Sequence, residues 1–516
     1  MRSSSSGSGA AARRVHVGHY LAYGSNDFLG AGAMAVISGW ILYFYTTFCG
    51  LTAVEAATIF ATARIFDAVA SPLIGYVSDH FHRTRLGRRF GRRRFFVLLS
   101  IPLLPSFALM WVDGHSFWYY LVTYVFFEVV YAMELIPYET LAAEMSPDYK
   151  VKAKFAGARI LFGQVSAILA GVLPGRIIEV FGKQSASTFL YLGITFAAIY
   201  MLVALAVFLF TWERPREQIE SLHDESAGSP LRSLKRLYSD LWATLRIRAF
   251  RLHLGMYIGG YISQDIFNAS FTYFVVFALG SSVVAASNYL GAMAFAQLIA
   301  VAAFIPLCLR FHPAPSYRLA VSLFAAGVLL FLALYKLGPV HALWMYVPVA
   351  IAGLGRGGLN YIPWNVYNYM ADVDEIVTGR RREGAFAGVM TFVRKTLQAL
   401  AVMSVGLLLQ AGGFVSGSAT QSPLAIQSIV MVMGAGTLAL LAFGYAISHR
   451  FHLNRETHGV LMAEIDRFKQ RPETHPTSTD RRIVEDLTGW PYEQLWGRGA
   501  ASSRAVVPVR PDARKA

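Results

Sequence analysis

Residues 63–79 read ARIFDAVASPLIGYVSD, and residues 80–94 continue as HFHRTRLGRRFGRRR. The first stretch has an apolar helical pattern in which Arg64 and Asp67 lie one turn apart, with Ser71 one further turn along the same face. A charge at the bilayer centre costs roughly 2.5–3.5 kcal/mol, so an ion pair inside such a segment indicates a functional site in a membrane protein. A structural pair that fastens two helices together is the alternative interpretation.

The composition of the whole chain is that of a membrane protein. Its 516 residues are 55% hydrophobic and 15% charged, whereas globular domains are about 25% charged. The net charge of +15 does not indicate nucleic-acid binding, because the arginines fall between apolar runs, as the positive-inside rule requires. No nucleotide-binding glycine loop and no metal-ligand motif is found. We therefore predict no enzyme activity, no cofactor, no metal site and no nucleic-acid partner.

The apolar segments predict an all-α membrane protein. About 20 residues are needed to cross the hydrocarbon core. Twelve segments are long enough, near residues 22–48, 54–79, 93–112, 117–140, 152–175, 187–212, 250–279, 285–310, 316–337, 341–371, 383–411 and 425–448. The connections after segments two, four, six and ten are basic or strongly charged, so we place both termini in the cytoplasm.

A weak internal repeat suggests that the twelve segments form two six-helix bundles. Pro137 precedes Asp148 by eleven positions, as Pro363 precedes Asp374, and Phe-Ala-Gly follows each pair. Equivalent motifs in two halves fit the parallel repeats of major facilitator transporters. The predicted organisation is an N-terminal cytoplasmic tail (1–21), an N-terminal bundle (22–212), a cytoplasmic linker (213–249), a C-terminal bundle (250–448) and a partly disordered cytoplasmic tail (449–516).

Polar side chains recur at helical spacing inside four of the apolar segments. The stripes are Glu128, Tyr131, Glu134, Tyr138 and Glu139; Tyr257, Tyr261, Gln264, Asp265 and Asn268; Arg356, Asn360, Trp364, Tyr367 and Asn368; and Thr391, Arg394, Lys395 and Gln398. Lipid does not solvate these groups, so they face one another or water. Rings that stack on sugar faces, among groups that bond hydroxyls, suit a glycoside. Interhelical bonds worth roughly 0.6 kcal/mol each are the alternative for any single residue.

Several motifs together resemble one transporter family, the glycoside–pentoside–hexuronide:cation symporters, the melibiose-permease-like branch of the major facilitator superfamily. The matching pieces are YGSNDF (23–28), ARIFDA (63–68), PLIG (72–75), TRLGRR (84–89), IPYETL (136–141), DY (148–149), ADVDE (371–375), TGRR (378–381) and EG (383–384). This resemblance implies two bundles of six helices that alternate access between the two membrane faces.

The resemblance also implies a cation site. Asp67 matches its first carboxylate, and Lys395 looks like the lysine that links the cation and sugar sites. The second carboxylate falls at Ser71, its asparagine neighbour at Ala70 and a threonine of the fourth helix at Ala132. Because sodium needs several hard oxygen ligands, we expect coupling to protons rather than sodium.

The family's two sugar-binding carboxylates are missing, since Ala31 and Leu135 stand at their positions. Asp27 and Glu134 lie near these positions in the sequence and are the candidate replacements. We assign Asp27 to substrate binding and Glu134 to cation coupling. A site that has lost acids and kept bases predicts an anionic sugar, because arginine pairs with a carboxylate through two bonds. A closer resemblance of residues 136–145, IPYETLAAEM, to the oligogalacturonide-transporter branch agrees with this.

The sequence therefore predicts a set of candidate site residues. For the substrate they are Asp27, Arg64, Arg159, Tyr257, Tyr261, Asp265, Asn268, Arg356, Asn360, Trp364, Tyr367, Thr391 and Lys395. For cation coupling they are Asp67 and Glu134. For a cytoplasmic gate whose charge pairs break when the halves rock, they are Asp79, Arg88, Arg89, Asp148, Asp372, Asp374 and Arg381.

We thus expect a secondary transporter of the bacterial inner membrane that imports a glycoside, of the uronic-acid-containing oligosaccharide class, by proton symport. Its partners are the sugar, the coupling cation and the lipid bilayer. One alternative is a lysolipid or drug carrier of the same fold. Another is a membrane sensor on a transporter scaffold, with the C-terminal tail as its output. A membrane-embedded enzyme is the least favoured, because no nucleophile–base pair stands out.

Overall fold

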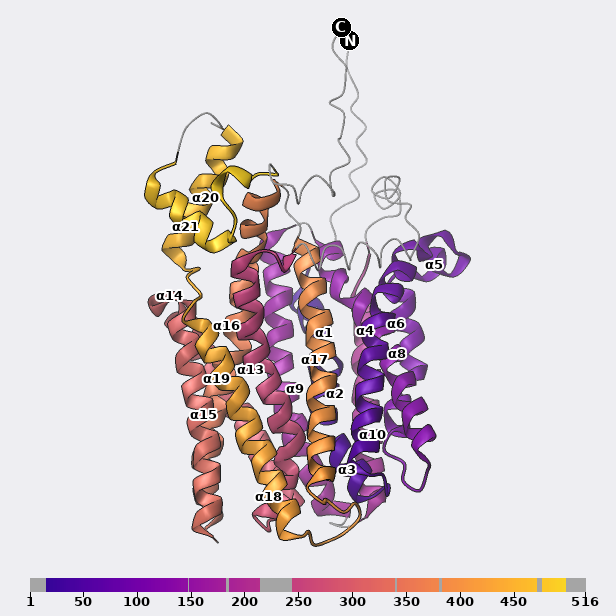
Figure 1. Cartoon of the computed structure of the whole chain (residues 1–516). Helices are drawn as coiled ribbons and strands as arrows, with labels where there is room; N and C mark the ends of the chain where they lie inside the picture. Colours follow the sequence, from indigo (N-terminus) through magenta and orange to yellow (C-terminus); the bar gives the residue numbers. More distant parts are fainter. Residues whose placement is uncertain are drawn as a thin grey trace.

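A computed structural model describes residues 15–146, 148–181, 185–213, 244–338, 341–379, 383–470 and 476–497. Throughout these residues the regular structure is helical (Figure 1). Most of the predicted linker, most of the N-terminal tail and the gate candidate Arg381 lie outside the described residues.

The N-terminal half begins with a segmented helix and continues through long ones. Its helices are α1 (Val17–Ser25), α2 (Asp27–Val36), a π turn (Ile37–Ile41), α3 (Leu42–Thr47), α4 (Ala53–His80), α5 (Arg85–Phe90), α6 (Arg94–Ser100), α7 (Ser106–Leu109), α8 (Phe117–Met145), α9 (Tyr149–Phe181) and α10 (Ala186–Phe210). A capping box starts α4, since Thr52 accepts from the Glu55 backbone and the Glu55 side chain accepts from Thr52. The helix that carries Arg64 and Asp67 therefore has a well-defined first turn.

The C-terminal half repeats this architecture. It contains α13 (Arg248–Tyr273), a π turn (Phe274–Ala278), α14 (Val283–Phe311), α15 (Pro313–Leu337), α16 (Tyr346–Thr378), α17 (Glu383–Ala411), α18 (Pro423–Met431), a second π turn (Val432–Gly436) and α19 (Thr437–Ser448). Ser282 and Ser422 cap the first turns of α14 and α18 with their hydroxyls. Gly379 ends α16 with φ +69°, a conformation that glycine adopts without strain.

Ten of the described helices have the length and apolar content to cross a membrane. The predicted span 93–112 is instead interrupted, because Pro102 and Pro105 break it into α6, a 3₁₀ turn and α7. The predicted span 250–279 is a continuous helix, α13 with its π turn. It is not among the ten, because its polar stripe makes it less hydrophobic than the other spans. The all-helical fold class is confirmed. The count of twelve spans and the cytoplasmic termini stay predictions.

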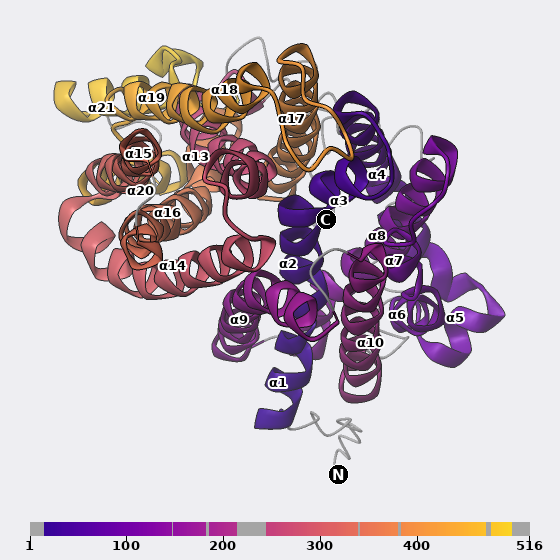
Figure 2. The same ribbon diagram turned by 90° about the horizontal axis from the view of Figure 1, so that it is seen from below.

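The two halves lie side by side, with α2, α4 and α9 facing α13, α14 and α17 across the middle of the molecule (Figure 2). Small residues line this boundary. An added Cβ at Gly406 of α17 would lie 2.4 Å from the Ala57 Cβ on α4, and one at Gly171 of α9 would lie 2.5 Å from the Gly291 nitrogen on α14. Such residues let helix backbones approach closely.

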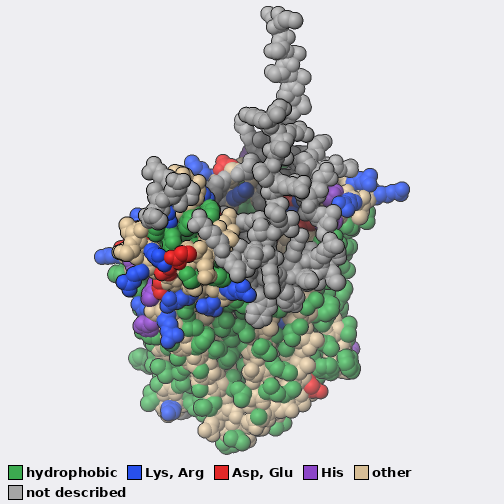
Figure 3. All heavy atoms as spheres, turned by 45° about the horizontal axis from the view of Figure 1, so that its top comes forward, with side chains coloured by type: hydrophobic (Ala, Val, Ile, Leu, Met, Phe, Trp, Pro, Cys, Tyr) green, Lys and Arg blue, Asp and Glu red, His purple; other side chains and the backbone are tan. Residues whose placement is uncertain are grey.

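The two ends of the molecule differ in charge. Basic side chains gather at one end, with α5 and the helices α20 (Arg455–Gln470) and α21 (Ser478–Thr488), above a belt of apolar side chains (Figure 3). We call this the basic end. Near the opposite end hydrogen bonds join the halves: Thr46 Oγ1 lies 2.7 Å from Tyr273 OH, and Thr272 donates to the Gly39 carbonyl at 3.0 Å.

The C-terminal tail folds further than the sequence indicated. Its described part forms α20 (Arg455–Gln470) and α21 (Ser478–Thr488), where we expected a partly disordered segment with one short helix. The ring of Phe468 stacks against those of Tyr492 and Trp496, at centroid distances of 5.6 and 5.3 Å. The backbone nitrogen of Trp496 donates to the Ile376 carbonyl at 2.8 Å, which attaches the tail to the end of α16. Aromatic packing thus gives this polar segment a small core of its own.

Candidate functional site

A cavity of about 530 Å³ lies between the two halves, within the 300–1,000 Å³ range of small-molecule sites. Both halves contribute to its wall, through α2, α4, α8 and α9 on one side and α13, α14, α16 and α17 on the other. Ten predicted substrate residues line it: Arg64, Tyr257, Tyr261, Asp265, Asn268, Arg356, Asn360, Trp364, Thr391 and Lys395. Asp27, Arg159 and Tyr367 are not part of the lining.

The predicted coupling residue Asp67 joins the two halves through Lys395. The Lys395 ammonium lies 2.7 Å from Asp67 Oδ2 and 2.9 Å from the Ser71 hydroxyl, which itself donates to Asp67 Oδ1 at 2.9 Å. Asp67 is completely buried, whereas the Lys395 side chain is partly exposed and lines the cavity. The Lys395 ammonium therefore occupies the oxygens of Asp67 and Ser71 in this structure.

Glu128 of α8 completes this charge cluster; we placed it in a polar stripe but not among the candidate site residues. Both of its carboxylate oxygens lie 3.1 Å from Arg64 Nη1, while Asp67 Oδ2 lies 3.5 Å away. A signal was available: two cations, Arg64 and Lys395, faced one predicted acid, and buried charges are normally paired. Helical spacing alone did not indicate which of the α8 acids Glu128, Glu134 and Glu139 would face α4.

A second ion pair lines the cavity within the C-terminal half, between α13 and α17. Both oxygens of Asp265 accept from Arg394, the Nη2 bond being 2.9 Å, and Gln398 donates to Oδ1 at 3.2 Å. The Arg394 guanidinium also lies 5.2 Å from the centroid of the Tyr261 ring. Asp265 is therefore engaged by protein groups, and Arg394 is a lining residue that our candidate set lacked.

Arg356 differs from the other cations of the cavity because its α13 partner is an amide. Its Nε donates to Gln264 Oε1 at 3.1 Å, and its Nη1 contacts Met293 Sδ at 3.0 Å. Gln264 in turn donates to Asn360 Oδ1 at 3.1 Å. Among the described residues no carboxylate pairs with Arg356.

Aromatic side chains form one side of the cavity. The rings of Tyr257 and Tyr261 lie 4.6 Å apart, and the Trp364 indole donates to Tyr261 OH at 2.9 Å. Trp364 keeps 43% of its surface exposed, although it lies among buried neighbours. Tyr367 lies behind it, with its ring 5.8 Å from the Trp364 ring, so it supports the platform rather than lining the cavity.

The remaining N-terminal candidates form a separate cluster. Arg159 Nη2 lies 3.4 Å from Asp27 Oδ1 and 3.2 Å from Glu139 Oε1, and only Glu139 of these three lines the cavity. Glu134 is fully buried and accepts from Asn26 at 3.1 Å. Asp27 and Arg159 thus meet each other, but neither joins the cluster of Asp67 and Lys395.

Comparison with known proteins identifies the family of the chain. A family model described as MFS/sugar transport protein matches residues 22–455 of the chain. The chain belongs to this family of major facilitator sugar transporters. Our predictions of a transporter rather than an enzyme, and of a multi-pass protein of the bacterial inner membrane, are confirmed.

Individual relatives and one solved structure support the assignment. An uncharacterized symporter of Synechocystis is 25% identical over 78% of this chain and 87% of its own. The glucuronide carrier protein homolog of Escherichia coli is 24% identical over 92% of this chain and 98% of its own. The nucleoside transporter NupG matches in fold, with a TM-score of 0.58 at 14% identity over 83% of this chain and 98% of its own. The resemblance to the glycoside–pentoside–hexuronide:cation symporters is thereby confirmed.

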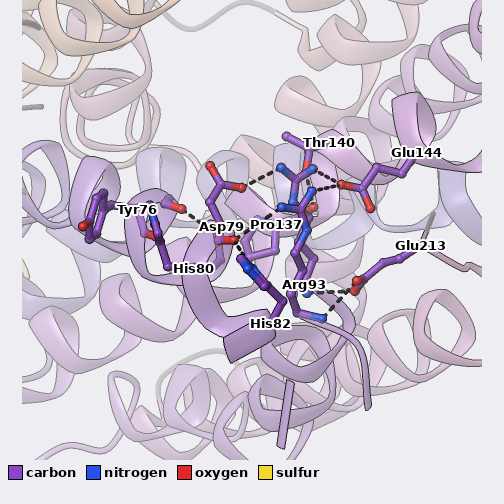
Figure 4. Close-up of polar contacts among 12 residues, drawn as sticks. Tyr76, Asp79, His80, His82, Arg93, Pro137, Thr140, Glu144 and Glu213 are labelled. Carbon is purple, nitrogen blue, oxygen red and sulfur yellow. Dashed lines mark hydrogen bonds and ion pairs between the residues drawn. The ribbon is translucent and has the colours of Figure 1, made fainter. Parts of the chain in front are cut away.

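In the N-terminal half of this transporter, the gate candidate Asp79 lies beside Arg93 (Figure 4). Arg93 Nη2 lies 2.7 Å from Asp79 Oδ1, and its Nη1 lies 2.8 Å from Glu144 Oε1. The predicted partners Arg88 and Arg89 lie on α5 instead, where Arg88 donates to the Arg83 carbonyl at 3.1 Å.

Two further acids of the N-terminal half bind backbone rather than arginine side chains. Glu213 accepts from the backbone nitrogens of Arg92, Arg93 and Arg94, at 2.7–3.0 Å, and so binds the start of α6. The predicted gate residue Asp148 accepts from the Lys150 backbone at 2.7 Å in the first turn of α9.

In the C-terminal half, the tail contacts two acids near the end of α16, the gate candidate Asp372 and the unpredicted Glu375. His458 Nε2 lies 2.9 Å from Asp372 Oδ2, and the Lys469 ammonium lies 2.6 Å from Glu375 Oε1. Asp374 is fully buried. The charge pairs described at the basic end therefore lie within one half, or between the C-terminal half and its tail.

Proposed function

We propose that the protein imports a glycoside that carries a carboxylate, by symport with protons. The main support for this proposal is that no carboxylate pairs with Arg356 among the described residues. Arg64, Arg394 and Lys395 each have a carboxylate within 3.5 Å, whereas Arg356 lines the same cavity with an amide and a thioether as its bonded partners.

A partly buried guanidinium inside a membrane-spanning segment and without a carboxylate is expensive, because little water remains to solvate its charge. A substrate carboxylate supplies the missing counter-charge, and arginine can bond it through two nitrogens. The platform of Tyr257, Tyr261 and Trp364 offers rings for the C–H faces of the sugar. The relative named as a glucuronide carrier homolog is consistent with this substrate class.

The pair of Asp67 and Lys395 supports proton coupling. A proton that binds Asp67 removes the carboxylate charge that holds the Lys395 ammonium. Because Lys395 already lines the cavity, the released ammonium can then attract the carboxylate of the substrate. Proton and substrate thereby favour each other's binding, which is the requirement for thermodynamic coupling.

Uptake into proteoliposomes tests both parts of this proposal. A methyl hexuronide and the matching methyl hexoside serve as acidic and neutral substrates, with an imposed pH gradient or an imposed sodium gradient. We expect concentrative uptake of the hexuronide with the pH gradient alone. Equal uptake of both sugars would contradict the acidic substrate, and accumulation driven only by sodium would contradict proton coupling.

A further inference from the structure

The partner of Arg356 distinguishes it from every other cation of the cavity. Two consecutive residues of α13 show the contrast, since Asp265 pairs with Arg394 and Gln264 pairs with Arg356. We propose that Gln264 determines the charge selectivity of the transporter: its neutral amide orients Arg356 while leaving the positive charge for the carboxylate of the substrate. This inference rests on the acidic substrate proposed above.

Three hydrogen bonds determine how the Gln264 amide is oriented. Its Nε2 donates to the Gly260 carbonyl at 3.0 Å and to Asn360 Oδ1 at 3.1 Å, so its Oε1 is the atom left for Arg356 Nε. If the amide were flipped, its NH₂ group would face the Arg356 Nε donor, and its oxygen would face the oxygens of Gly260 and Asn360. The side chain is nearly buried, with 5% of its surface exposed. Gln264 is therefore a fixed acceptor for Arg356.

The bond to Nε decides which part of the guanidinium remains for a ligand. Arg356 uses Nε for Gln264 and Nη1 for the weak acceptor Met293. Among the described residues Nη2 has no hydrogen-bond partner, and the guanidinium, which lies 5.9 Å from the centroid of the Phe267 ring, lines the cavity. The end of the guanidinium is thus the part that remains for the carboxylate of a substrate.

Asp265, which follows Gln264 on α13, attracts Arg356 through space but makes its ion pair with Arg394. Both oxygens of Asp265 accept from Arg394, and Gln398 adds a third bond. A glutamate at position 264 would have nearly the same shape as glutamine, but it would bring a carboxylate to Arg356 Nε. Such an internal carboxylate would compete with that of the substrate. The difference between an acidic and a neutral preference therefore depends on one atom of one side chain.

The decisive variant is Gln264→Glu, compared in proteoliposomes with wild type for uptake of the methyl hexuronide and the methyl hexoside. We expect the ratio of acidic to neutral uptake to fall at least about tenfold, through a higher KM for the hexuronide, because a charge-assisted bond is lost. Gln421→Glu is the matched control, since it makes the same chemical change outside the cavity, just before α18, where its described bonds are to the backbone of Val415 and Ser418. Its ratio should stay near that of wild type.

A second variant covers the case in which Gln264→Glu fails to fold. Gln264→Met keeps the charge of Arg356 but removes its fixed acceptor, so the hexuronide KM should rise by about threefold to tenfold with the hexoside unchanged. A folded Gln264→Glu protein with the selectivity of wild type would overturn the inference, as would an unchanged hexuronide KM in Gln264→Met. If wild type itself prefers no acidic sugar, the proposed function fails instead.

Discussion

The ammonium of Lys395 lies 2.7 Å from the Asp67 carboxylate, and this pair joins α17 of one half to α4 of the other beside the cavity. One contact thus connects the candidate proton site, the lining of the candidate substrate site and the boundary between the two halves. A change of charge at Asp67 therefore affects both ligand binding and the attachment of the two halves.

Replacing Asp67 with asparagine should separate transport from coupling. The amide of the variant carries no titratable charge, so the pH gradient no longer drives uptake, while substrate exchange across the membrane persists. Proteoliposome counterflow and pH-driven accumulation measure the two activities. Uphill uptake at the wild-type level would exclude Asp67 as the coupling residue.

Removal of Glu128 should destabilise the fold. Arg64 would lose the nearer of its two carboxylates in a fully buried position, and breaking a buried pair costs on the order of 3 kcal/mol. Thermal unfolding of Glu128→Gln in detergent measures the loss. Glu139→Gln is the control, because its partner is more exposed and the pair should contribute less than about 1 kcal/mol. Equal shifts for the two variants would contradict the role of Glu128.

A bulky residue at the boundary between the halves should stop transport. Gly406→Val places a branched side chain against Ala57, where even a Cβ has no room. We expect at least about a tenfold loss of uptake, because the α4–α17 contact that must re-form on closing is blocked. Gly157→Ala serves as the comparison, since nothing lies within 4 Å of an added Cβ there. Normal flux in Gly406→Val would argue against close packing at this boundary during the cycle.

Truncation after Arg455 should preserve transport but lower stability. It removes α20 and α21, together with the contacts of His458 and Lys469 to the end of α16. Since the cavity residues are untouched, uptake should stay within about threefold of wild type, while the midpoint of thermal unfolding falls by a few degrees. Complete loss of uptake in a folded truncated protein would favour the sensor hypothesis.

Cys49 should react slowly with thiol reagents. Burial raises the pKa of its thiol to about 12, so little thiolate is present near neutral pH. Alkylation near neutral pH should be slow and should accelerate as the pH rises toward the pKa, because the thiolate is the reactive form. Mass spectrometry of the alkylated protein measures the rate. Rapid labelling at neutral pH would show that the thiol is accessible and ionised.

Much of the fold was predictable because membrane insertion depends on local composition. Apolar segments, basic loops and family motifs identified the helices and the residues of the cavity, and ten of thirteen predicted substrate residues line it. The span 93–112 was predicted as one helix from its hydropathy, which does not register that Pro102 and Pro105 lack the backbone N–H of a continuous helix. We predicted too little structure for the C-terminal tail, because the ring stack around Phe468 depends on residues more than twenty positions apart.

Sequence alone thus determined the class of protein, the family and which helix faces are polar, because those properties depend on residues one or two turns apart. Only the tertiary structure decided the partners: Glu128 for Arg64, Lys395 for Asp67, and Gln264 rather than an acid for Arg356. Partner choice depends on how each helix is rotated against its neighbours, and that rotation follows from the packing of all the helices together.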